Sequence, residues 1–150
     1  MDDLRTFPFI LRRMLESVPP ELLTKRSASG MFSCVENAWH LADLEVEGYG
    51  PRLRRLLSED SPSLPDFRGD VIAEQRNYNS LTLGGALERF ERARAENVAL
   101  IEAASDEDKK RAGEQEGVGT VTFERVVAMM REHDEGHAAE LKSLLGELGR

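Results

Sequence analysis

Cysteine is nearly absent from this sequence, since its 150 residues include only Cys34. A lone thiol excludes an internal disulfide framework and is typical of a protein from a reducing compartment. Long hydrophobic runs are absent too, because no stretch approaches the roughly 18 apolar residues of a membrane span. The apolar run 7–11 is too short for a signal peptide, and two arginines follow it instead of preceding it. We therefore expect a soluble cytoplasmic protein.

Positive charge is also in short supply. The sequence has 20 basic and 28 acidic residues, which gives a formal net charge of −8. Such a balance argues against a general nucleic-acid-binding or anionic-membrane-binding surface. The length suits one domain over residues 1–150, long enough to bury about two thirds of its unfolded surface without a disulfide or a structural metal.

β-branched residues are scarce, and this scarcity indicates the fold class. Val, Ile and Thr total 17, whereas the helix formers Leu, Ala, Glu and Arg total 68. This ratio predicts an all-α protein. Apolar residues at helical spacing predict four long helices, which run from about 4 to 18, from 33 onward, from 82 to 104 and from 122 to 148. The fold class that we expect is a four-helix bundle.

The second helix has a marked start and an expected irregularity. Ser33 and Glu36 have the spacing of a capping box, in which each side chain bonds the other residue's backbone N–H. Farther along, Gly48, Gly50 and Pro51 predict a kink, since proline removes a backbone donor.

The connections between the helices predict the topology. Residues 61–81 show no helical period, and about twenty extended residues can travel the full length of a helix. The long crossover between helices 2 and 3 therefore favours an up-down-down-up order. Residues 105–119 are charged and contain glycine, so we expect a mobile, solvated loop.

The three histidines carry the main functional signal. His133 and His137 advance by about 100° per residue onto the apolar stripe of the last helix, one turn apart. Two helical histidines at this spacing can bind one metal ion, as in the H-E-x-x-H arrangement. The alternative is a buried polar network without a metal, because buried imidazoles need hydrogen-bond partners in any case.

His40 supplies a third imidazole if the second and fourth helices pack together. Three neutral nitrogen ligands with an open position are typical of a catalytic metal site. Zinc and nickel suit imidazole best, while iron, cobalt, manganese and copper stay open. Carboxylates at Glu36, Asp43 or Asp134 can orient the rings from behind the metal ligands.

The order of these motifs resembles a known family. The run Ser33-x-x-Glu36-x-x-x-His40-Leu-Ala-Asp43, followed by His133-Asp-x-x-His137, resembles the DinB-like (YfiT-like) family of metalloenzymes. The stretch 120–123 also resembles that family's entry into its last helix. One departure is Phe32, where many relatives carry Trp before the serine.

The resemblance implies an up-down-down-up bundle, often a homodimer, with a divalent metal on His40, His133 and His137. Relatives include thiol-S-transferases that use low-molecular-weight thiols such as bacillithiol or mycothiol. We therefore predict a metal-dependent hydrolase or thiol transferase acting on a small molecule. One alternative is a non-catalytic metal- or ligand-binding bundle in stress response, and another is a structural dimer with a buried histidine network.

Other residues are weaker candidates. Asp134 takes the place of Glu in H-E-x-x-H and is the nearest general base, although a supporting role suits it better. Arg94 and Asn97 can reach into a pocket to hold an anionic substrate, but Arg94 can equally extend to the surface. We interpret Cys34 as an incidental thiol and the cluster around Arg52 as a solvated helix end.

Overall fold

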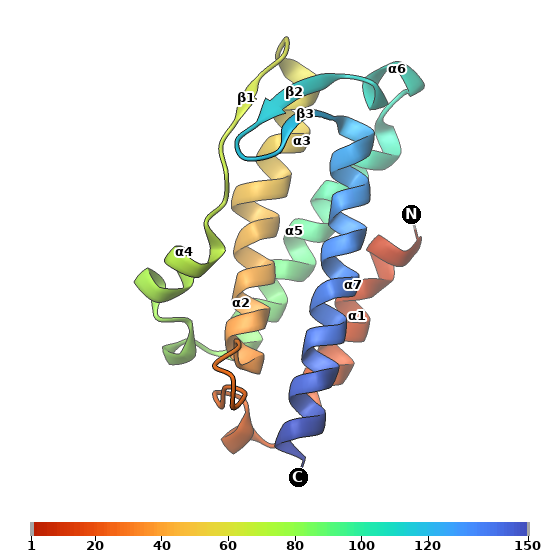
Figure 1. Ribbon diagram of the computed structural model, residues 1–150. Helices are drawn as coiled ribbons and strands as arrows, with labels where there is room; N and C mark the ends of the chain where they lie inside the picture. Colours follow the sequence, from red (N-terminus) through yellow and green to blue (C-terminus); the bar gives the residue numbers. More distant parts are fainter. Residues whose placement is uncertain (1, 150) are drawn as a thin grey trace.

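Helices account for most of the computed structural model, which describes residues 2–149, and they form a four-helix bundle (Figure 1). One rod of the bundle is built from three consecutive segments, namely α2, the π-helix η2 and α3. The segments of the four rods are α1 (Asp2–Glu16), α2 (Cys34–Leu44), η2 (Glu45–Tyr49), α3 (Gly50–Ser58), α5 (Leu83–Ala103) and α7 (Phe123–Leu148). The four predicted helices are thus confirmed, with ends shifted by a few residues.

Side-chain caps define where three of these helices begin. The Ser33 hydroxyl accepts a hydrogen bond from the Glu36 N–H, and Glu36 accepts one from the Ser33 N–H, so the predicted capping box is present. Thr82 caps α5 and Thr122 caps α7 in the same way, each through its hydroxyl oxygen. Because the caps are local, the sequence predicts them well.

The irregularity expected near Pro51 takes the form of the π-helix η2. The Gly50 N–H donates to the Glu45 carbonyl five residues earlier, instead of to the one four residues earlier. π-turns of this kind insert one residue into a helix and often occur at functional sites. In this rod the turn leaves the Glu45 side chain buried inside the bundle.

Two segments predicted as loops contain regular structure, and the all-α prediction needs correcting. The connection 61–81 holds β1 (Ser63–Leu64), α4 (Gly69–Arg76) and the 3-10 turn η3 (Tyr78–Ser80). The stretch 105–119 holds a short helix and most of a hairpin instead of a mobile loop. These elements are α6 (Asp106–Lys109), β2 (Ala112–Gln115) and β3 (Gly119–Thr122). Near the N-terminus, a 3-10 turn η1 (Pro20–Leu22) follows α1.

The strands form a small sheet in the order β1-β2-β3, with β1 parallel to β2 and β2 antiparallel to β3. Sequence reasoning missed it because glycine was interpreted as a loop signal. At Gly113 the reason for glycine is close packing, since an added Cβ would lie 2.6 Å from the Pro62 carbonyl oxygen.

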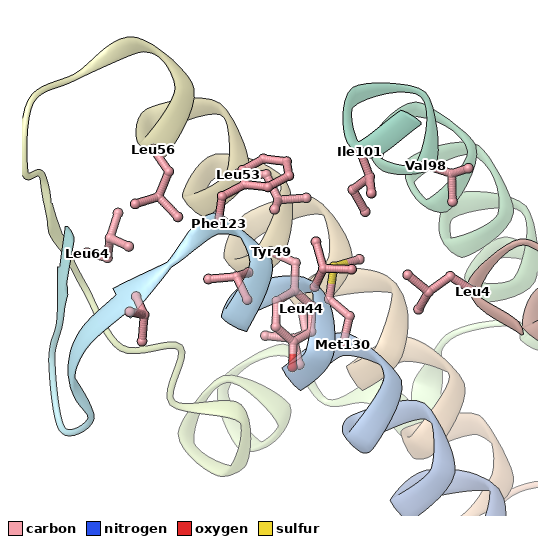
Figure 2. Packing of buried hydrophobic residues seen from close by; sticks show 13 residues of the cluster. Leu4, Leu44, Tyr49, Leu53, Leu56, Leu64, Val98, Ile101, Phe123 and Met130 are labelled. Atoms are coloured by element: carbon pink, nitrogen blue, oxygen red, sulfur yellow. The ribbon is translucent and has the colours of Figure 1, made fainter. Parts of the chain in front are cut away.

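Two clusters of buried apolar side chains fill the bundle. One includes Leu53 and Phe123 and lies where α3 and α7 meet the sheet (Figure 2). The other includes Leu41, Phe90 and Leu141, on α2, α5 and α7.

Buried or half-buried polar residues lie between the two clusters on three of the four helical rods. On α2 and η2 they are His40, Asp43 and Glu45; on α5 they are Arg94 and Asn97; on α7 they are His133, Asp134 and His137. We call this set the polar belt. Within residues 2–149 no helix is long and apolar enough to cross a membrane.

Candidate metal centre

The three histidines meet within the polar belt. One ligand atom from each of His40, His133 and His137 lies within 4.8 Å of the others. The ring centroids are separated by 4.4 Å between His133 and His137, 4.9 Å between His40 and His137, and 5.4 Å between His40 and His133. The structure thus brings together the residues that the sequence singled out as metal ligands, from two helices that pack side by side.

The hydrogen bonds of Asn37 fix which nitrogen of His137 faces the centre. The Asn37 amide nitrogen donates to the Phe32 and Ser33 carbonyls, so its Oδ1 is an acceptor. This oxygen lies 2.7 Å from His137 Nδ1, which must therefore carry the proton. The lone pair of the neutral ring is then on Nε2, the nitrogen left free for a ligand.

His40 and His133 face each other through Nε2 atoms 3.4 Å apart. The other nitrogen of His40, Nδ1, is buried and has no hydrogen-bond partner among the described residues. Gly69 lies against this ring, since a Cβ added there would be 2.8 Å from Nδ1. Phe32 and Phe67 pack on the same ring at centroid distances of 5.9 and 6.1 Å. The imidazole is therefore held in place by packing.

The electrostatic surroundings keep all three imidazoles neutral. Burial and the two neighbouring histidines lower the pKa of His133 to about 3. Burial, together with His40, lowers the pKa of His137 to about 4, and burial lowers the pKa of His40 as well. Neutral imidazole is the form that binds a metal.

The donor set fits a divalent metal ion. Three neutral nitrogens point to one place, and they lack enough protein partners to satisfy one another. The three rings are only partly buried, so a further ligand from solvent can reach the same point. An ion held by three nitrogens with an open position is typical of catalytic sites, not of closed structural ones.

Two of the carboxylates expected to orient the histidines form hydrogen bonds with other residues instead. Glu36 binds Arg26 and closes the capping box. Asp43 accepts hydrogen bonds from Tyr78, Arg76 and Arg89. Neither has a hydrogen bond to a histidine within the described part of the chain.

The supporting role falls to Asn37, a residue that sequence reasoning missed. Its signal was available, because it lies three residues before His40 and therefore on nearly the same face of the helix. The Glu140 carboxylate lies 3.6 Å from His137 Nδ1, beyond hydrogen-bond distance.

Asp134 belongs to a second cluster in the polar belt. Both of its oxygens accept hydrogen bonds of 2.8 Å from Arg94, which also binds Glu45 and the Leu4 carbonyl. Five bonds use all five N–H donors of the guanidinium. Burial raises the pKa of the Asp134 carboxyl to about 6, although the bonds from Arg94 oppose this rise.

Arg94 is 2% exposed, which excludes the alternative that it extends to the surface. Asn97 donates to Glu45 in the same cluster, and neither side chain is free for a substrate. Arg52 is buried as well, which corrects its interpretation as part of a solvated helix end. Cys34 is buried, and burial raises the pKa of its thiol, in keeping with an unreactive cysteine.

Comparisons with known proteins identify relatives of this fold. A family model described as the DinB superfamily matches residues 6–141. The structure is similar to that of YfiT from Bacillus subtilis, described as a probable metal-dependent hydrolase with an unusual four-helix bundle topology. The TM-score is 0.91 at 20% sequence identity, over 99% of this chain and 85% of YfiT. No curated protein matches the sequence.

Proposed function

Because the chain belongs to the DinB superfamily, we propose that it is a metal-dependent enzyme that acts on a small molecule at His40, His133 and His137. The reaction is a hydrolysis or the transfer of a low-molecular-weight thiol. The observation that carries this proposal is that three neutral imidazoles converge at a place that solvent can reach. One ligand nitrogen from each ring lies within 4.8 Å of the other two. The name given to YfiT supports the hydrolytic version.

The chain's own residues hold and orient the ligand nitrogens. Asn37 keeps the proton of His137 on Nδ1, and Gly69 leaves room for the His40 ring. Zinc or nickel suits three imidazoles best. When bound there, such an ion lowers the pKa of a water or a thiol and supplies a nucleophile at neutral pH.

Aromatic rings pack around the centre. Phe32 and Phe67 pack on His40, and the Tyr49 ring lies 5.9 Å from that of His133 in an edge-on arrangement. An apolar surround of this kind strengthens electrostatic interactions within the site.

For Asp134 we favour a positioning role over the catalytic role as general base. Its two oxygens are engaged by Arg94, so it fixes the rotation of α7 and with it the two histidines of that helix. A variant Asp134→Asn separates the two roles. Loss of turnover with unchanged metal affinity would restore the general-base role, whereas weaker metal binding supports positioning.

Elemental analysis of protein purified without a metal-affinity tag tests the metal centre. We expect stoichiometric divalent metal in the wild type and its loss in His133→Ala and His137→Ala. The matched control is Glu135→Ala, an exposed position on the same helix. Substoichiometric metal that does not change in the histidine variants would contradict the proposal and favour a buried histidine network.

Turnover is tested separately, with the metal-loaded protein. Esters and amides probe hydrolysis, and electrophiles supplied with bacillithiol or mycothiol probe thiol transfer. Full metal loading without turnover, together with a fourth protein ligand closing the site, would favour the non-catalytic binding bundle.

We also infer the up-down-down-up order for the bundle, because β1 and α4 return along the α2–α3 rod before α5 begins (Figure 1). A homodimer is the assembly that the family resemblance implies. A monomeric mass in solution at micromolar concentration would contradict it.

A further inference from the structure

Arg52 is a buried cation without a counterion. Its side chain lies on α3 and is 6% exposed. No ion pair to it occurs among residues 2–149, and its Nε is buried without a hydrogen-bond partner. Within the described part of the chain, the only acceptor that it reaches is the Pro65 carbonyl, 3.4 Å from one terminal nitrogen. Burying a guanidinium in this way costs free energy that the protein does not recover through its own contacts.

The contrast with Arg94 shows that the gap is specific to Arg52. Arg94 is buried too, at 2% exposed, yet it makes five hydrogen bonds and pairs with two carboxylates. Those carboxylates, Glu45 and Asp134, are thereby occupied. Burial lowers the pKa of Arg52 and the charge of the Asp66 carboxylate opposes this, but Asp66 is exposed and forms no ion pair with Arg52 among residues 2–149.

Arg52 adjoins the metal centre through Tyr49. Its guanidinium carbon lies 5.6 Å from the centroid of the Tyr49 ring, and that ring packs against His133. The positive charge of Arg52 is also one of the influences that lower the pKa of His133. Arg52 and His133, one of the three candidate metal ligands, thus both lie against the same tyrosine ring.

We propose that Arg52 binds an oxyanion of the substrate, a carboxylate or phosphate group, while the rest of the substrate lies at the three histidines. This proposal rests on the function proposed above and adds the substrate class. A guanidinium offers parallel N–H donors that match the geometry of such groups. The low local dielectric makes the pairing stronger than it is on an open surface. Small molecules with an anionic group are therefore preferred over neutral analogues.

The alternative is a structural role, in which Arg52 joins α3 to the connection after β1 through Tyr49 and the Pro65 carbonyl. The two roles predict opposite stabilities for Arg52→Gln. A structural clamp loses stability when it is removed. An anion site loses a buried, unpaired charge, so the variant is at least as stable as the wild type when no anion is present.

Direct binding measurements test the proposal. Inorganic phosphate and acetate are titrated separately into metal-free and metal-loaded protein, with affinity read by NMR and by the shift in melting temperature. We expect Arg52→Gln to weaken binding about tenfold or more, and Arg52→Lys to weaken it less, since lysine keeps the charge but not the fork. The matched control Arg54→Gln, an exposed arginine on the same helix, should bind like the wild type.

The arms of the experiment separate this proposal from the metal centre. Binding of either anion to the metal-free wild type that is lost in Arg52→Gln supports the anion site even if no metal binds. Equal affinity in both proteins, or binding that occurs only with metal and does not depend on Arg52, would overturn it. A destabilised Arg52→Gln whose melting temperature does not respond to anions would establish the structural role instead.

Discussion

Two buried polar clusters lie side by side in the same belt of the bundle, and they are built in opposite ways. The Arg94 cluster is closed, because its guanidinium uses every donor on Glu45, Asp134 and a backbone carbonyl. The histidine centre is open, because its three rings turn ligand nitrogens toward one another without enough protein partners.

The difference separates support from function. In the closed cluster every N–H of Arg94 is already hydrogen-bonded, so no donor remains for a ligand. Its role is to fix how α5, η2 and α7 pack against one another. The open centre keeps imidazole nitrogens free to bind a ligand. Leaving them without partners lowers the stability of the protein, and a bound ligand offsets this loss. Asp134 and His133 are neighbours in the sequence, yet they belong to different clusters because their side chains leave α7 in different directions.

Opening the closed cluster should have the largest effect. Replacing Arg94 with Met leaves the buried Asp134 without a partner and leaves Glu45 with only its hydrogen bond from Asn97, so two buried carboxylates lose their cation. This costs about 3–5 kcal/mol of the free energy of unfolding. Urea denaturation measures this loss. Arg92→Met, at an exposed position on the same helix, is the control and should change stability little. A loss below about 1 kcal/mol for Arg94→Met would mean that the cluster does not hold the helices together.

Removing the support of the open centre should affect metal binding more than stability. Asn37→Ala takes away the acceptor for His137 Nδ1, and we expect metal affinity to fall about 10- to 100-fold. Competition with a chelator of known affinity measures this change. Asn37→Asp restores an acceptor and should recover much of the affinity. If both variants bind as the wild type does, the orientation of His137 has another source.

Crowding the His40 ring should have a smaller effect. In Gly69→Ala the new Cβ would lie 2.5 Å from His40 Cε1, so the ring must shift and we expect metal affinity to fall by several-fold. The control is Gly84→Ala, where an added Cβ has no neighbour within 4 Å and the gain in helix propensity reaches up to about 1 kcal/mol. Unchanged affinity in Gly69→Ala would show that the ring tolerates displacement.

Because of the histidines in the open centre, acid should gradually lower the stability of the metal-free protein. The unfolded chain binds protons at histidine below a pKa of about 6.5, whereas His133 and His137 in the folded state stay neutral down to about 3 and about 4. Protons therefore favour unfolding in this window, and the stability that is present above pH 6.5 declines as the pH falls through it.

Melting temperatures between pH 7.5 and 4.5 measure this decline, with the double variant His133→Gln, His137→Gln as the reference. The difference between the two curves should grow toward acid, which separates the histidines from the buried Asp134. Parallel curves would contradict neutral, buried histidines.

How well the sequence predicted the fold depended on the distance over which each feature acts. The capping box at Ser33 and the stripe that carries His133 and His137 involve residues within a few turns of one another, and they were predicted correctly. The hairpin was missed because Gly113 is required by its contact with Pro62, a residue about fifty positions away. Composition alone cannot reveal such a contact.

The same limit applies to the candidate site. Helical periodicity placed His133 and His137 on the core-facing stripe of the last helix, and the family resemblance implied that they share a metal with His40. The hydrogen-bond partners of these side chains come from distant parts of the sequence. Asn37 lies 100 residues from His137, and Glu45 lies 49 residues from Arg94. A side chain's face follows from its own helix, but its partner depends on how the helices dock.

The sequence by itself thus determined four helices, the capping box at Ser33 and two histidines on the core-facing stripe of the last helix, because these follow from backbone hydrogen bonding and the burial of apolar surface. The tertiary structure decided which polar residues are paired and which are left free. In the folded protein every N–H of Arg94 is paired, the ligand nitrogens of the three histidines are free, and Arg52 is buried without a counterion. Only docking of the rods settles these outcomes, because each depends on atoms brought together from distant parts of the chain.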